Sequence, residues 1–135
     1  MALRLPTGAD SLSVDLEYHA TTNEHPGTPT TVGVGKIGRV QGIRLMQVTS
    51  ASGKYSRAVL LINAVEYLAV EADSTYPTLD SHADSNLYTI AEYFFTPESC
   101  PILQPGDTVN VSLRTANVSS VTAVHARVLA YQYTP

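Results

Sequence analysis

Alternating apolar and polar side chains recur along this chain and predict β-strands. Residues 12–18 (LSVDLEY) and 109–114 (VNVSLR) alternate strictly, as half-buried strands do. Residues 32–49 predict a further β region that Gly42 interrupts with a turn or bulge, and residues 87–95 (LYTIAEYFF) predict an aromatic-rich strand. Short strands at this spacing are typical of a two-sheet sandwich.

The last predicted strand, over 121–133, has two faces of opposite character. One face is small and apolar, with Val124, Ala126, Val128 and Ala130. The other face carries His125, Arg127, Leu129, Tyr131 and Tyr133. Because interfaces are enriched in tyrosine and arginine, we expect His125, Arg127, Tyr131 and Tyr133 to belong to a contact surface.

The segment 57–72 (RAVLLINAVEYLAVEA) fits two different structures. Its apolar residues can form a helical stripe at spacings of three and four. Several β-branched residues would lie outside or weaken that helix, and two strands joined near Asn63 and Ala64 account for them better. We therefore predict an all-β, jelly-roll-like sandwich of about eight strands, with an α+β fold containing a helix at 57–72 as the alternative.

The chain length of 135 residues predicts one domain. Residues 1–11 are predicted to form an extended N-terminal arm, because Pro6, Gly8 and Asp10 break any periodic pattern. Residues 12–135 then form the sandwich. A polar, Pro- and Thr-rich stretch at 20–31 predicts a long loop of the functional or mobile kind.

Charge and composition narrow the classes of partner. The formal net charge is −4, lysine occurs only twice, and the six arginines are scattered singly along the sequence. Nucleic-acid binding needs clustered cations, so we expect none. No stretch approaches the roughly 20 apolar residues of a membrane span, and the first residues lack a secretory signal, so synthesis in a cytoplasm is expected. Cys100 is the only cysteine, which excludes an internal disulfide.

Two motifs suggest ligands. The run GVGKIG at 33–38 matches the dinucleotide pattern G-x-G-x-x-G, but a loop precedes it and β-type residues follow it, so we predict glycines of a strand and no cofactor. The run DSHADSN at 80–86 places Asp80, His82 and Asp84 at alternate positions, as weak candidates for a cation site. No pattern typical of a cupin or hydrolase site occurs, and we expect no enzyme.

The closing segments PGDTVNVSLRT and TAVHARVLAYQY, the arm MALRLPTGADS and the loop TTNEHPGTPTT resemble the small decoration (cement) and accessory structural proteins of tailed-phage particles. The resemblance implies a non-enzymatic virion protein, often trimeric, that holds neighbouring capsid subunits together. Leu3 and Leu5 of the arm would then join the interface, and strand-edge pairing with aromatic and arginine contacts would supply the binding energy. The alternative is a carbohydrate-binding sandwich that uses Tyr, Asp and Asn side chains, with a cation at 80–86.

Overall fold

The computed structural model describes residues 8–18, 24–80, 86–116 and 121–135. Within these residues the protein is all-β and has no helix, which confirms the predicted fold class. The strands are β1 (Asp10–Ser11), β2 (Val14–Tyr18), β3 (Glu24–Pro26), β4 (Thr30–Thr31), β5 (Ile37–Thr49), β6 (Tyr55–Ile62), β7 (Val65–Asp73), β8 (Leu79–Asp80), β9 (Leu87–Phe94), β10 (Ile102–Leu103), β11 (Thr108–Ala116) and β12 (Val121–Tyr133).

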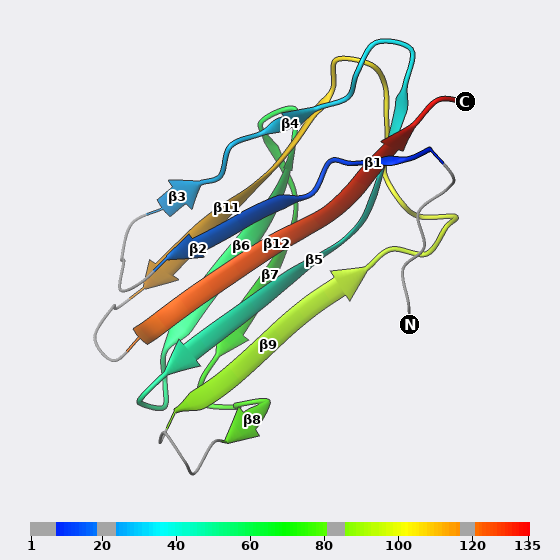
Figure 1. Ribbon diagram of the computed structural model, residues 1–135. Coiled ribbons are helices and arrows are strands. Elements are labelled where there is room, and N and C mark those ends of the chain that lie inside the picture. Colours follow the sequence, from blue (N-terminus) through cyan, green and yellow to red (C-terminus); the bar gives the residue numbers. More distant parts are fainter. Residues whose placement is uncertain (1–7, 19–23, 81–85, 117–120) are drawn as a thin grey trace.

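The strands form two antiparallel sheets, which lie one behind the other in Figure 1. Sheet A has the order β1-β12-β5-β9-β8, with β2 also paired to β12 and β10 also paired to β5. Sheet B has the order β3-β11-β6-β7, with β4 also paired to β11. If β1 with β2, β3 with β4, and β9 with β10 each count as one interrupted strand, the order is that of a jelly roll, whose sheets interleave early and late strands.

The hairpin of β6 and β7 settles the ambiguous segment 57–72 in favour of two strands. Asn63 and Ala64 form its two-residue turn with φ values of 52° and 63°, the left-handed pair of a type I′ hairpin. The Asn63 side chain fixes the turn against the next loop, because its Oδ1 accepts from the Thr108 N–H (2.9 Å) and its Nδ2 donates to Asp107 Oδ1 (3.1 Å). No helix forms over 57–72.

The core lies between the two sheets and draws on both. The apolar face of β12 is buried as predicted, with Val124, Ala126, Val128 and Ala130 at most 2% exposed. Ile43 and Leu45 of β5 lie beside them in sheet A, and Leu60 and Leu113 of sheet B belong to the same core cluster. Because β12 pairs with β5 on one side and with β1 and β2 on the other, it is a central strand.

Buried polar residues close one end of this core, where the sequence predicted no special feature. Gln47 is fully buried and donates from Nε2 to the Lys54 carbonyl (3.1 Å), while the Ser56 hydroxyl donates to Gln47 Oε1 (2.5 Å). The hydroxyl of Thr89, opposite Gln47 in the sheet, is buried without a hydrogen-bond partner among the described residues. Such a group is costly to bury, which makes Thr89 a local defect.

Parts of the predicted loop and of the predicted N-terminal arm form short strands. Residues 24–26 and 30–31 of the predicted 20–31 loop instead form β3 and β4, which border β11. The segment pairs through its backbone, and the Ser112 hydroxyl also donates to Glu24 Oε1 (3.0 Å). Because its side chains are mostly polar, the segment gave no strand signal in the sequence. At the other end of the predicted arm, Asp10 and Ser11 pair with Gln132 and Tyr131, and residues 1–7 lie outside the described part of the chain.

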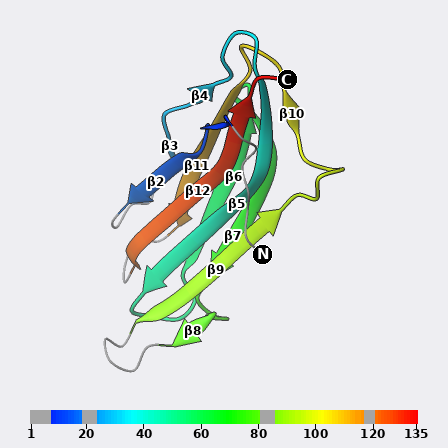
Figure 2. The same ribbon diagram turned by 45° about the vertical axis from the view of Figure 1, so that its right-hand side comes forward.

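Strand β5 has two irregularities that shape its neighbours. Gln41 is an extra residue opposite β12, so the predicted interruption at Gly42 is a bulge one residue earlier. Past β9 the chain leaves β5 at Phe95, whose N–H donates to the Gln41 carbonyl, and it returns at Pro101, whose carbonyl accepts from Val40. Figure 2 shows this excursion projecting from the side of the sandwich.

Of the glycines of GVGKIG, Gly38 lies in strand β5, as predicted, whereas Gly33 and Gly35 belong to the turn before it. The Lys36 N–H donates to the Gly33 carbonyl (3.1 Å) and closes the turn, and β5 begins directly afterwards at Ile37. No helix follows whose N-terminus could hold a pyrophosphate, so the dinucleotide match has no structural counterpart here.

Candidate interaction surface

The four predicted interface residues of β12 lie on one side of sheet A. His125, Arg127, Tyr131 and Tyr133 lie at alternate positions of β12 and point away from the core, with Arg127 exposed and the other three half-buried. We call the outward side of β2, β12, β5, β9 and β10 the outer face of sheet A. The structure brings further residues from these neighbouring strands to the predicted set.

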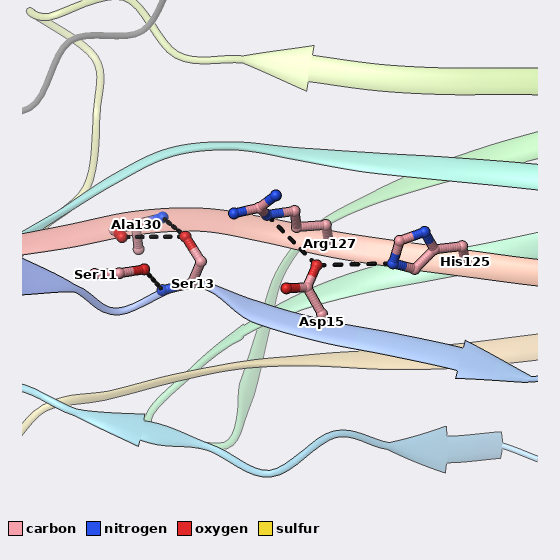
Figure 3. A network of polar contacts seen from close by, with 6 residues as sticks. All are labelled: Ser11, Ser13, Asp15, His125, Arg127 and Ala130. Carbon is pink, nitrogen blue, oxygen red and sulfur yellow. Dashed lines mark hydrogen bonds and ion pairs between the residues drawn. The ribbon is translucent and has the colours of Figure 1, made fainter.

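Asp15 of β2 lies opposite Arg127 and links two of the predicted residues (Figure 3). Its Oδ1 is 3.4 Å from Arg127 Nε and 3.7 Å from His125 Nε2. Just before β2, the Ser13 hydroxyl bridges to β12, accepting from the Ala130 N–H (3.2 Å) and donating to the Ala130 carbonyl (3.3 Å). This double contact fixes β2 against β12 and so holds Asp15 in place.

A row of four charges crosses the outer face of sheet A at one level. Strand register places Asp15, Arg127, Arg44 and Glu92 directly side by side on β2, β12, β5 and β9. Glu92 Oε2 lies 3.8 Å from Arg44 Nε, so each arginine has an acid on its outer side and the other arginine on its inner side. Between them is a hollow of about 230 Å³ lined by Arg44, Met46, His125 and Arg127.

Sheet B carries the same sequence of charges on its own outer face. Glu24, Arg114, Arg57 and Glu71 lie side by side on β3, β11, β6 and β7. Here Arg57 is held more firmly, since its Nη2 is 2.5 Å from Glu66 Oε1 and its Nε is 3.8 Å from Glu71. Burial, and then a hydrogen bond with Glu71, raise the pKa of the adjacent Tyr55 hydroxyl.

Both rows reflect a wider separation of charge within the fold. The central strands β5, β6, β11 and β12 contain no acidic residue but carry five arginines, namely Arg39, Arg44, Arg57, Arg114 and Arg127. None of the strands that flank them contains Lys or Arg, and all of these except β4 and β10 contain at least one acid. Arginines that are scattered along the sequence are therefore gathered in space, which we did not expect from the sequence.

Toward the C-terminal end of β12, the outer face of sheet A becomes apolar and aromatic. Phe94 and Ile102 are 44% and 53% exposed, and the rings of Tyr131 and Tyr133 lie 6.1 Å apart at 34°. Phe94 and Leu129 flank Gly42 from opposite sides in the sheet. From the sequence we predicted only the residues of β12 on this half of the surface. Phe94 and Ile102 lie there because β9 and β10 pair with β5 in this register.

Arg39 connects the aromatic end to the excursion after β9. Its Nη1 donates to Cys100 Sγ (3.5 Å), and Tyr131 lies opposite it in register. Hydrogen bonding with the Tyr133 side chain, and then with Cys100, raises the pKa of Arg39. Cys100 is thus a partly buried thiol that supports this corner.

A second aromatic group lies between β7 of sheet B and β9 of sheet A. The Phe95 ring packs against the core and meets the rings of Tyr93 and Tyr67 edge-on, at centroid distances of 5.1 and 6.0 Å. Tyr67 is the extra residue of a bulge in β7, which turns its side chain toward Phe95. Tyr67 and Tyr93 remain about half exposed, at 54% and 46%.

The remaining predicted site residues stay predictions. Leu3 and Leu5 lie outside the described residues, as do His82 and Asp84, while Asp80 ends strand β8. Over the described ranges, no three His, Cys, Asp or Glu side chains are close enough together to hold a metal ion. The same ranges contain no helix that is long and apolar enough to cross a membrane.

No family model and no curated protein sequence matches the chain. Among solved structures it is similar to the insecticidal delta-endotoxin Cry8Ea1 from Bacillus thuringiensis, at 14% identity and a TM-score of 0.45, over 90% of this chain and 19% of the toxin chain. It is also similar to the extra small virus (XSV) VLP of the giant freshwater prawn Macrobrachium rosenbergii, at 10% identity and TM-score 0.39, over 98% of this chain and 82% of that one.

A third similar structure is the catalytic domain of a GH87 alpha-1,3-glucanase in complex with nigerose, at 9% identity and a TM-score of 0.38. This match covers 94% of the present chain and 26% of the glucanase chain. With TM-scores below 0.5, none of the three likenesses carries weight for function.

Proposed function

We propose that this protein is a non-enzymatic structural protein of a larger assembly and that it binds neighbouring protein subunits through the outer face of sheet A. The observation that carries the proposal is the aromatic end of that face, where Phe94 and Ile102 are exposed on the same side of the sheet as Tyr131 and Tyr133. Exposed apolar groups that are gathered together on a surface mark interaction sites. The sequence resemblance to phage decoration proteins makes the finer proposal a virion decoration protein that stabilises a capsid.

The charges of the fold favour contacts through faces rather than through strand edges. Strands β2 and β7, and the part of β9 beyond its short pairing with β8, carry Asp15, Glu17, Glu66, Glu71 and Glu92, so two copies that approached edge to edge would bring acids together. Like charges at directly opposed positions destabilise strand pairing, and charged side chains are a common protection of sheet edges. We expected strand-edge pairing from the sequence, but we now propose contacts through the outer face of sheet A instead.

Analytical ultracentrifugation of the full chain, alone and with capsid particles, tests this function. We expect a defined oligomer or sedimentation with the particle, and we expect Phe94→Ser and Ile102→Ser to weaken that association about tenfold each or more, as loss of a buried apolar anchor does. Val65→Ser is the matched control, since Val65 is 66% exposed on β7 of the other sheet. A lone monomer that binds no particle would refute the proposal.

A carbohydrate-binding sandwich is the second candidate, and the aromatic group of Tyr67, Tyr93 and Phe95 favours it. Two half-exposed tyrosine rings supported by a packed phenylalanine can stack on a sugar face. A glycan array with the wild type and Tyr67→Ala tests this candidate. A glycan signal that Tyr67→Ala abolishes would support it, and an array without a signal would remove it.

A further inference from the structure

The hollow between Arg44 and Arg127 is the most strongly charged feature of the outer face of sheet A. The two arginines lie directly opposite each other on the central strands β5 and β12, and each side chain is about half exposed, at 52% and 48%. Like charges at directly opposed positions destabilise a sheet. An anion between the two guanidinium groups would convert this repulsion into two favourable contacts.

The guanidinium donors needed for such an anion are not used by other residues in the described part of the chain. Asp15 and Glu92 approach Arg127 and Arg44 at Nε, at 3.4 and 3.8 Å, and neither pair forms a hydrogen bond. Among the described residues, the terminal Nη atoms of both arginines have no hydrogen-bond partner. In the matching row of sheet B, by contrast, Glu66 already accepts a hydrogen bond from Arg57 Nη2.

The surroundings of the hollow select a small oxyanion over a nucleic-acid backbone. A phosphate chain laid across the row would meet Asp15 and Glu17 on one side and Glu92 on the other. A single carboxylate avoids these acids because the hollow lies between them. Met46 supplies an apolar wall of the hollow, which suits the aliphatic stem of an acidic side chain.

We infer that this hollow binds the carboxylate of an Asp or Glu side chain from a neighbouring protein subunit, held by Arg44 and Arg127. The identification of the partner as a protein rests on the proposed function, whereas the carboxylate site rests on the geometry of the two arginines alone. The apolar end of the same face would then supply contact area, and the arginine pair would fix orientation and register.

NMR of the full chain tests the site through the Nε–Hε signals of the arginines. The probe is N-acetyl-glutamate α-amide, which has one carboxylate, with N-acetyl-glutamine α-amide as its neutral counterpart at equal ionic strength. We expect saturable shifts of Arg44 and Arg127 with the glutamate probe and none with the glutamine probe. Arg44→Gln and Arg127→Gln should each weaken binding about tenfold, the loss of a charged hydrogen bond.

Arg114→Gln is the matched control, because Arg114 occupies the equivalent place in the row of sheet B and should leave the affinity unchanged. The thermal midpoints of Arg44→Gln and Arg127→Gln should stay close to that of the wild type, since each change removes both a like-charge contact and a weak, exposed ion pair with Glu92 or Asp15. No saturable shift, equal weakening by Arg114→Gln, or tighter binding of a 12-nucleotide oligothymidylate than of the glutamate probe would each overturn the inference. Such a failure would leave the sedimentation test untouched, because that test changes Phe94 and Ile102.

Discussion

Alanine substitutions at the three glycines of the GVGKIG run should have different effects on stability, because the backbone φ and the space around the Cα differ among them. Gly33 has ordinary space around its Cα, since an alanine Cβ there would lie 3.5 Å or more from Gln132 Oε1 and the Lys36 side chain. Gly35 has open space but a φ of +72°. Gly38 has no room, since a Cβ there would lie 2.9 Å from Val32 Cγ2 and 3.2 Å from Leu103 Cβ.

Because of these constraints, the alanine substitutions should change the free energy of unfolding in different directions. Gly33→Ala should stabilise by about 0.5–1 kcal/mol, because alanine restricts the unfolded chain and fits the native backbone. Gly35→Ala should destabilise by about 1–2 kcal/mol, the usual cost of left-handed backbone for an L-residue. Gly38→Ala should destabilise by about 1–3 kcal/mol through overpacking in the core beside Leu103.

Urea unfolding followed by circular dichroism measures these differences, and at about 3–5 °C per kcal/mol the thermal midpoints would show them too. The order of stability should be Gly33→Ala, wild type, then the other two variants. Equal losses for all three, or a loss for Gly33→Ala as large as for Gly38→Ala, would refute the reasoning. It would mean that the stability of the three variants does not depend on the φ and the space at each glycine.

Three further substitutions test local features of the fold. Thr89→Val should stabilise by about 1 kcal/mol, because it replaces a buried hydroxyl that has no partner among the described residues, and a loss of stability in urea unfolding would contradict this. Ala64→Gly should stabilise by about 0.5–1 kcal/mol in the same assay, because glycine relieves the left-handed φ of 63° in the hairpin turn, and an unchanged midpoint would speak against it. Hydrogen bonds from the Thr75 N–H, and then from the Thr75 hydroxyl, lower the pKa of Asp73 below its ordinary 3.8. The ionised Asp73 therefore stabilises the fold above pH 3.8, and this stabilisation is lost as the pH falls through the lowered pKa. The thermal midpoint of Asp73→Asn should therefore lie below that of the wild type at pH 7 and meet it at low pH, whereas a constant gap would exclude this origin.

Periodicity made the faces of single strands predictable. The period of two in 121–133 identified both the buried and the outward residues of β12, and the β-branched residues of 57–72 favoured the hairpin that the structure shows. Both features depend on local sequence, because a strand places successive side chains on opposite sides whatever its neighbours are. Turn chemistry helped less, since Ala64 is an unusual residue for a left-handed turn position.

Features that depend on which strands become neighbours could not be predicted in the same way. Arg44 and Arg127 are 83 residues apart by number, and only the jelly-roll order and the register of β5 with β12 bring them together. Phe94 and Ile102 reach the outer face for the same reason. One signal was nevertheless present in the sequence, because the segments 37–49, 55–62, 108–116 and 121–133 contain arginine but no acid.

The separation of charge between central and outer strands gives edges and faces different roles in assembly. Acids on the outer strands oppose further strand pairing, so they protect the open edges that a sandwich, unlike a closed barrel, retains. The arginines they surround lie in the middle of each face, where a partner can reach them without displacing a strand. On sheet B, Arg57 is hydrogen-bonded to Glu66, whereas on sheet A the terminal Nη atoms of Arg44 and Arg127 have no hydrogen-bond partner among the described residues. Because of this difference, we expect a subunit contact to form on the outer face of sheet A rather than on that of sheet B.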